Sequence, residues 1–274
     1  MTPTSSPDTA DGRPQARGTG ATHRRFVAIG DSWTEGLGDP DPTRPGGLRG
    51  WADRVAERMA SRTPDFAYAN LAIRGRTVAE ILDGQLAPAL DLGPDLLSIQ
   101  GGGNDLLHLR VDIDEVVAAI DAATARAVAA GTQVLLFTHG AAASGPFRAL
   151  RGRIAVFNEL VREVVDAHGV VLVDNWRIRE ARDPRLWDAD RVHLSPLGHR
   201  RAATQVLDAL GVPHEAGTPD LAQQAEVPVV AGRDRLRAEL DWARLFAGPW
   251  IHRRVRGRSL GDGVTAKRPS LGPV

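Results

Sequence analysis

The chain contains no cysteine. This absence excludes disulfide bonds, thiol nucleophiles and metal centres built on cysteine ligands. Lysine is nearly absent too, with Lys267 the only one, although arginine brings the basic side chains to 34, equal to the 34 acidic ones. The formal net charge is therefore zero, without the basic excess that is typical of nucleic-acid binding. We expect no nucleic-acid partner.

Long apolar runs are also missing. No stretch approaches the length of a transmembrane helix, so we expect no membrane span. Residues 1–24 hold no apolar segment like that of a signal peptide, and with the absence of cysteine this favours a cytoplasmic location. The same residues are rich in Ser, Thr, Pro, Gly and Arg, which predicts a disordered N-terminal arm.

Short apolar runs alternate along the chain with stretches of helical periodicity. Five runs predict strands, at 25–29, 66–71, 95–100, 133–138 and 169–173. Between them apolar residues recur every three or four positions, as in amphipathic helices, most clearly over 150–164. Strands separated by helices pair in parallel through right-handed crossovers. The sequence therefore predicts a three-layer α/β domain over residues 25–211.

The last quarter of the chain has a different character. Residues 212–230 are rich in Pro, Ala and Gln and predict a linker. A helix is predicted at about 234–246, and the chain ends in a basic tail, so 212–274 is expected to be linker, amphipathic helix and tail. The apolar stripe of this helix fits packing against the core or a partner subunit, a lid over the site, or attachment to anionic lipid.

Polar residues gather directly after the predicted strands. The segments are Gly30-Asp31-Ser32-Trp33 after the first strand, Arg74-Gly75-Arg76 after the second, Gly102-Gly103-Asn104-Asp105 after the third, and Asp190-Arg191-Val192-His193 beyond the fifth. In open parallel sheets, reacting groups collect at the carboxyl ends of the strands. We therefore expect these four segments to lie close together.

Together these segments supply the parts that ester hydrolysis needs. Ser32 is the candidate nucleophile, and His193 is the candidate base that takes its proton. Asp190 can bond the other ring nitrogen and fix the tautomer. The backbone N–H groups of Ser32 and Gly75 and the side-chain amide of Asn104 are the candidate donors to an oxyanion.

Each segment also has a plain structural interpretation. Ser32 can cap the helix that follows, Gly75 and Asn104 can serve turns, and the Asp–His pair can be a surface ion pair. His139 competes as a base because it too follows a strand, but no carboxylate lies shortly after it, which favours a structural or pocket role. Asp105 is expected to be a structural hydrogen-bond acceptor.

The four segments, in this order, resemble the sequence blocks of the SGNH hydrolases, also called the GDSL esterase/lipase family. The first block reads Gly-Asp-Ser-Trp, with Trp33 where the family name has leucine. The resemblance covers residues 25–211. It implies a flavodoxin-like fold with a five-stranded parallel sheet of order 2-1-3-4-5. It also implies hydrolysis of a small-molecule ester through an acyl-enzyme, by Ser32, His193 and Asp190, with no metal or cofactor.

Other functions stay open at this point. The same site would serve an acyltransferase, or a deacetylase for a sugar or natural product. A metal-dependent phosphoesterase would use the oxygen and nitrogen ligands Asp31, Asn104, Asp105, Asp190 and His193. A non-catalytic binding module is the alternative from outside the enzymes. Nothing in the sequence selects the acyl part, the alcohol or the oligomeric state.

Overall fold

The computed structural model describes residues 22–140, 149–178, 180, 183–214, 232–249, 256 and 259–274. Most of the arm predicted at 1–24 and of the linker predicted at 212–230 lies outside the described residues. No helix among the described residues has the length and apolar character needed to cross a bilayer.

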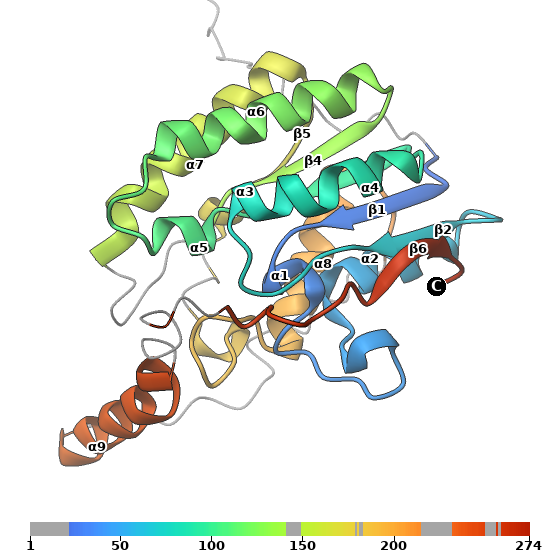
Figure 1. Ribbon diagram of the computed structural model, residues 1–274. Helices are drawn as coiled ribbons and strands as arrows, with labels where there is room; N and C mark the ends of the chain where they lie inside the picture. Colours follow the sequence, from blue (N-terminus) through green and yellow to red (C-terminus); the bar gives the residue numbers. More distant parts are fainter. Residues whose placement is uncertain are drawn as a thin grey trace, which may run out of the picture.

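The described residues form a central sheet of six strands in the order β5-β4-β3-β1-β2-β6 (Figure 1). The strands are β1 (Arg25–Ile29), β2 (Ala67–Asn70), β3 (Leu96–Ile99), β4 (Gln133–Phe137), β5 (Val171–Val173) and β6 (Arg268–Gly272). Strands β1 to β5 are parallel. The predicted α/β class and the strand order 2-1-3-4-5 are confirmed.

The expected count of five strands is corrected to six. Strand β6 lies within the segment predicted as a basic tail, and it pairs antiparallel with the outer edge of β2. Its residues, Arg-Pro-Ser-Leu-Gly, lack the apolar run of the buried strands, and Pro269 removes a backbone donor. Such a strand forms at a sheet edge because a neighbouring strand offers unpaired backbone groups there.

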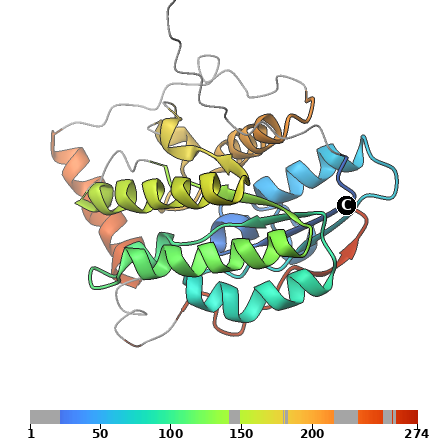
Figure 2. The same ribbon diagram turned by 90° about the horizontal axis from the view of Figure 1, so that it is seen from above.

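Helices cover both faces of the sheet (Figure 2). One face carries α3 (Val78–Ile81), η2 (Leu82–Leu86), α4 (Ala87–Asp91), α6 (Ile113–Ala129) and α7 (Arg151–His168). The other face carries α1 (Ser32–Glu35), α2 (Gly50–Ala60) and α8 (Pro196–Leu210). The remaining helical segments are η1 (Pro45–Gly47), α5 (Gly103–Leu106), η4 (Asn175–Arg177), η6 (Pro184–Leu186), α9 (Gly232–Trp242) and η8 (Ala243–Ala247).

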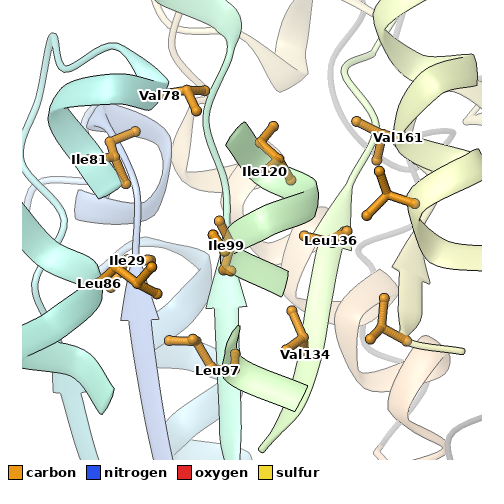
Figure 3. Packing of buried hydrophobic residues seen from close by; sticks show 14 of the residues in the cluster. Ile29, Val78, Ile81, Leu86, Leu97, Ile99, Ile120, Val134, Leu136 and Val161 are labelled. Carbon is orange, nitrogen blue, oxygen red and sulfur yellow. The ribbon is translucent and has the colours of Figure 1, made fainter. Parts of the chain in front are cut away.

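The alternation of side chains along β1 explains why both faces must be covered. Val27 and Ile29 point to one face, where they join the core shown in Figure 3. Phe26 and Ala28 point to the other face and pack among residues of α2 and α8. All four are fully buried, which explains why the strand is a continuous apolar run in the sequence.

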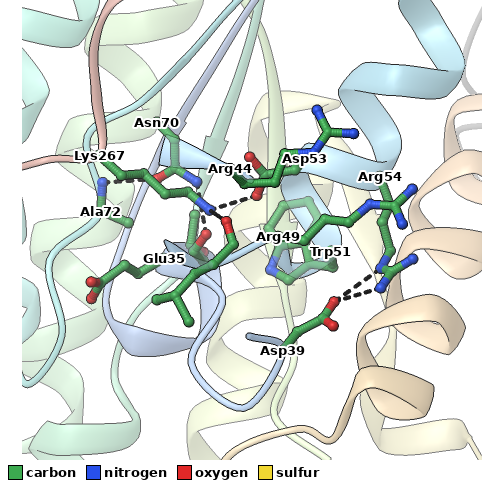
Figure 4. Close-up of polar contacts among 12 residues, drawn as sticks. Glu35, Asp39, Arg44, Arg49, Trp51, Asp53, Arg54, Asn70, Ala72 and Lys267 are labelled. Carbon is green, nitrogen blue, oxygen red and sulfur yellow. Dashed lines mark hydrogen bonds and ion pairs between the residues drawn. The ribbon is translucent and has the colours of Figure 1, made fainter. Parts of the chain in front are cut away.

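The segment leading into β6 is tied to the domain by a buried ion pair (Figure 4). Lys267 Nζ lies 2.6 Å from Asp53 Oδ2 on α2 and donates to the carbonyl of Leu48 at 3.3 Å. Both charged side chains are almost fully buried, at 3% and 4% exposure. Burial raises the pKa of Asp53 to about 6, although the ammonium of Lys267 opposes the rise.

Replacing Lys267 by methionine should therefore destabilise the fold. The substitution leaves the Asp53 carboxyl buried without its partner, and breaking such a pair typically costs about 3–5 kcal/mol. Urea unfolding measures the change. The double variant K267M/D53L is the control and should recover most of the loss, because no charge is then left buried. A single variant as stable as the wild type would contradict this account of the pair.

Candidate active site

The backbone around Gly30 sets Ser32 at the carboxyl end of β1. Gly30 has φ +157°, and a Cβ there would lie 2.6 Å from the carbonyl oxygen of Gln100, so a side chain does not fit. Helix α1 begins at Ser32, and its N-cap side chain is that of Asp31, which accepts from the N–H of Trp33 at 3.0 Å. Ser32 is therefore not the cap, and its half-buried hydroxyl faces other partners.

The sheet order places the second segment beside the nucleophile, because β1 lies between β2 and β3. Glu35 at the end of α1 forms an ion pair with Arg74 and accepts from its backbone N–H at 2.8 Å. Asn70 at the end of β2 donates to the carbonyl of Thr34 at 2.8 Å (Figure 4). These contacts hold the Gly75 segment against the helix that begins with Ser32.

The fourth segment is a hairpin between η6 and α8. Trp187 and Leu194 form an antiparallel bridge, and the N–H of Asp188 donates to the carbonyl of His193 at 2.8 Å. Ser195 caps α8 by accepting from the N–H of Gly198 at 3.2 Å. The hairpin and the capped helix fix the course of the chain on both sides of His193.

Ser32, His193 and Asp190 form one hydrogen-bonded chain. Ser32 Oγ lies 2.9 Å from His193 Nε2, and His193 Nδ1 lies 2.5 Å from Asp190 Oδ2. Asp190 Oδ1 accepts from the backbone N–H groups of Val192 and His193, both at 2.9 Å. A carboxylate at Nδ1 favours the tautomer with the proton there, which leaves Nε2 free to accept from the serine hydroxyl.

The surroundings of Asp190 favour its ionised form. Burial acts against ionisation, but bonds from the His193 ring and from the two backbone N–H groups outweigh it, so the pKa of Asp190 lies below its usual value. The side chains of His193 and Asp190 are only 12% and 21% exposed. In such a setting, fixed charges and dipoles act more strongly than in water.

Asn104 connects the third segment with the first two. Its Nδ2 donates to the carbonyl of Arg76 at 3.0 Å and reaches Asp31 Oδ2 at 3.4 Å. The second contact is long for a hydrogen bond, so one N–H of the amide is weakly held. The three segments that carry the expected oxyanion donors therefore meet around this side chain.

Gly75 has φ +75°, in the left-handed region that favours glycine. A Cβ there would lie 2.4 Å from Ser259 Oγ, and Ser259 donates to the Gly75 carbonyl at 3.2 Å. Glycine is thus required both by its conformation and by the close approach of the C-terminal segment. This contact could not be predicted from the sequence, because 184 residues separate its partners.

Two further carboxyls of the candidate segments have structural partners. Asp105 accepts from the N–H of Val78 at 3.0 Å, as a structural role requires. Burial raises the pKa of Asp31 to about 6, although its bond from Trp33 and the nearby His193 oppose the rise. In the part of the chain that the structure describes, no group of three or more His, Cys, Asp or Glu side chains is arranged to hold a metal ion.

The competing histidine, His139, contacts the chain just before the third segment and residues of α7. Its Nε2 donates to the carbonyl of Gly101 at 2.9 Å, its backbone N–H bonds Asn158, and its ring packs on Phe157. Burial lowers its pKa, although the bond to Gly101 opposes this. These contacts give His139 a structural role beneath the third segment.

A second histidine, His199 on α8, is fully buried. Its Nδ1 accepts from the N–H of Trp51 at 3.1 Å, and its Nε2 donates to the carbonyl of Leu37 at 2.9 Å. Burial lowers its pKa to about 4, so the ring is neutral and joins α8 to the loop after α1.

A mainly apolar cavity of about 40 Å³ lies beside the hairpin that carries His193. Its walls include Trp33, Leu186, Trp187 and Leu194. Neither Ser32 nor His193 is among the residues that line it. Trp187, which pairs with Leu194 in the hairpin, lies in the wall of this cavity.

Comparison with known proteins identifies the family of the chain. A family model described as the GDSL-like lipase/acylhydrolase family matches residues 28–201. No curated protein matched the chain in a sequence comparison.

Several solved structures share the fold. An α/β hydrolase from the metagenome of Lake Arreo, Spain, is 24% identical with a TM-score of 0.57, over 73% of this chain and 99% of that one. TesA is 23% identical with a TM-score of 0.58, over 68% and 97% of the two chains. The acetylxylan esterase Axe2 from Geobacillus stearothermophilus is 20% identical with a TM-score of 0.57, over 72% and 97%. By its sequence match over most of the three-layer domain, the chain belongs to the GDSL-like lipase/acylhydrolase family.

Proposed function

We propose that this protein is a serine hydrolase that cleaves carboxylic esters of small molecules through an acyl-enzyme intermediate. The observation that carries the proposal is the chain of contacts from Ser32 Oγ to His193 Nε2 at 2.9 Å and from His193 Nδ1 to Asp190 Oδ2 at 2.5 Å. Membership of the GDSL-like lipase/acylhydrolase family supports it.

In the first half of the reaction, Ser32 Oγ attacks the acyl carbon while its proton moves to His193 Nε2. The carbonyl oxygen becomes an oxyanion, and its donors are the N–H groups of Ser32 and Gly75 and the amide of Asn104. When the tetrahedral intermediate collapses, the bond to the alcohol oxygen breaks and His193 returns the proton to that oxygen. Asp190 stabilises the imidazolium in between.

The second half repeats this chemistry with water. His193 takes a proton from the water as its oxygen attacks the acyl carbon on Ser32. The intermediate then expels Ser32 Oγ, which regains its proton from His193, and the acid is released.

No step requires a metal or a cofactor. Undiminished activity in a chelator, with labelling of Ser32 by a fluorophosphonate, is therefore the outcome expected of the proposal; a metal-dependent phosphoesterase and a binding module each predict otherwise.

Asn104→Ala should lower kcat by roughly 10²–10³-fold, because loss of one oxyanion donor removes stabilisation that develops only in the transition state. KM should change little. Steady-state kinetics with a short-chain aryl ester measures both constants, and circular dichroism verifies that the fold is intact. A folded variant with wild-type kcat would remove Asn104 from the oxyanion site.

A second candidate function within the same chemistry is the removal of acetyl groups from a carbohydrate. The specific observation in its favour is the structural likeness to Axe2, which is named as an acetylxylan esterase. A screen of aryl esters of increasing acyl length, with acetylated sugars included, separates the two. Added alcohols and product analysis test acyl transfer, which predicts a new ester in place of the free acid.

A further inference from the structure

Helix α9 contacts the hairpin that carries Asp190 and His193. Trp242 Nε1 on α9 donates to the backbone carbonyl of Asp190 at 3.2 Å. Glu239, one turn earlier, pairs with Arg191 Nη1 at 2.7 Å. The Arg191 guanidinium carbon also lies 4.9 Å from the centre of the Trp242 ring, within range of a cation–π contact. The helix therefore holds two consecutive residues of the candidate acid–base segment.

Arg191 occupies an unusual backbone conformation. Its φ is +61°, and within the described residues only one other non-glycine residue, Asp65, has a positive φ. Side chains other than glycine disfavour this region. Arg191 stands at the turn between Asp190 and the two N–H groups, of Val192 and His193, that bond the Asp190 carboxylate. Arg191, with its strained backbone, thus belongs to the turn that orients the Asp190 carboxylate.

The contact does not serve the hydrophobic core. Leu236 and Leu240, on the apolar stripe of α9, are both 63% exposed, and Leu245 in η8 is 66% exposed. A helix with its leucines in solvent contributes little burial to stability. The Glu239–Arg191 pair is itself partly exposed and contributes little alone. What remains specific about the contact is the geometry that it imposes on Arg191 and Asp190.

We propose that α9 is a positioning element for the acid–base segment, with Trp242 as its principal positioning residue. Trp242 and Glu239 hold Arg191 in its left-handed conformation and fix the Asp190 backbone, so that the carboxylate stays aligned with His193 and the imidazole with Ser32. Full activity therefore requires a helix outside the matched family domain, which ends at residue 201. The proposal rests on the hydrolase function proposed above.

The test uses the full-length protein and the rate at which a fluorophosphonate labels Ser32, with ester kinetics beside it. Trp242→Ala should slow labelling and lower kcat roughly tenfold, less than the ~10²-fold that a 1 Å misplacement of reacting groups can cost. KM and the melting temperature should stay close to wild type, and the pH profile of kcat/KM should shift. Trp242→Phe, which keeps the ring and loses the N–H, should fall in between. Leu236→Ala, on the exposed stripe of the same helix, should match the wild type.

A second pair of variants separates positioning from a general structural effect. Glycine adopts a positive φ without strain, so in an Arg191→Gly background the further change Trp242→Ala should cost less than it does alone. If wild-type Ser32 is labelled and Trp242→Ala is labelled equally fast, or if its lost activity follows a lowered melting temperature, the positioning role is wrong. If wild-type Ser32 is not labelled at all, the hydrolase function itself fails.

Discussion

Ser32→Ala should abolish ester hydrolysis and leave the fold intact. Ser32 Oγ is the atom that His193 Nε2 contacts at 2.9 Å, and alanine leaves no group to form the acyl-enzyme. In a serine hydrolase of unrelated fold, loss of the nucleophile lowers kcat by about 10⁶-fold, and we expect a loss of this order here. Stability should change little, because Asp31 and not Ser32 caps α1.

Burst and steady-state kinetics with an aryl ester, together with fluorophosphonate labelling, measure the effect. Ser61→Ala is the matched control, since Ser61 is an exposed serine at the end of α2 whose hydroxyl bonds only the nearby carbonyl of Arg58 among the described contacts. The control should label and turn over like the wild type. Undiminished turnover by a folded Ser32→Ala protein would eliminate Ser32 as nucleophile and with it the proposed mechanism.

Asp190→Asn should have the second largest effect on activity, a fall in kcat of about 10⁴-fold with little change in KM. Asparagine keeps the size of the side chain but can donate to Nδ1, which favours the tautomer with the proton on Nε2. That ring can no longer accept from Ser32. The exposed Asp188 of the same hairpin supplies the control, and Asp188→Asn should keep wild-type kcat. Equal kcat in the two variants would contradict the role of Asp190.

The same substitution has a pH signature in stability. Because the pKa of Asp190 is lowered in the folded protein, its ionised form favours folding. This contribution is complete above the pKa of an unfolded aspartate and is lost as the pH falls from there through the lowered value. The unfolding free energies of wild type and Asp190→Asn should therefore converge in acid. Urea titrations at a series of pH values test this convergence.

The sequence was sufficient to predict the class of fold and which segments meet at the candidate site. Strand ends are visible in the sequence as glycines and polar residues after apolar runs, and parallel strands bring their carboxyl ends to one edge of the sheet. Ser32, Gly75, Asn104 and the Asp190 segment could thus be predicted as neighbours before any coordinates were known. This prediction was possible because each of these residues belongs to a short segment that is recognisable by itself, and the segments follow the strands in order.

The long-range contacts that hold the candidate site together could not be predicted in the same way. The ion pair of Glu35 with Arg74 and the contact of Ser259 with Gly75 join residues 39 and 184 positions apart. Charged and small polar residues occur throughout this chain, and nothing in their spacing selects one partner over another. Only the packing of the strands and of the C-terminal segment decides which of them meet.

The C-terminal part of the chain shows most clearly which features the sequence predicts and which depend on the tertiary structure. Helical periodicity predicted α9 as a helix, because periodicity reflects local backbone geometry. It also indicated an apolar stripe, whose role as a packing face, a lid or a lipid contact stayed open. The structure exposes Leu236 and Leu240 to solvent and brings Trp242 to Asp190. Strand β6 had no apolar pattern at all and exists because β2 offers an open edge. The sequence by itself determined most of the helices and strands and the candidate reactive groups, because these depend on residues that are neighbours in the chain. The tertiary structure alone decided which distant residues contact one another, because those contacts depend on how the whole chain folds in space.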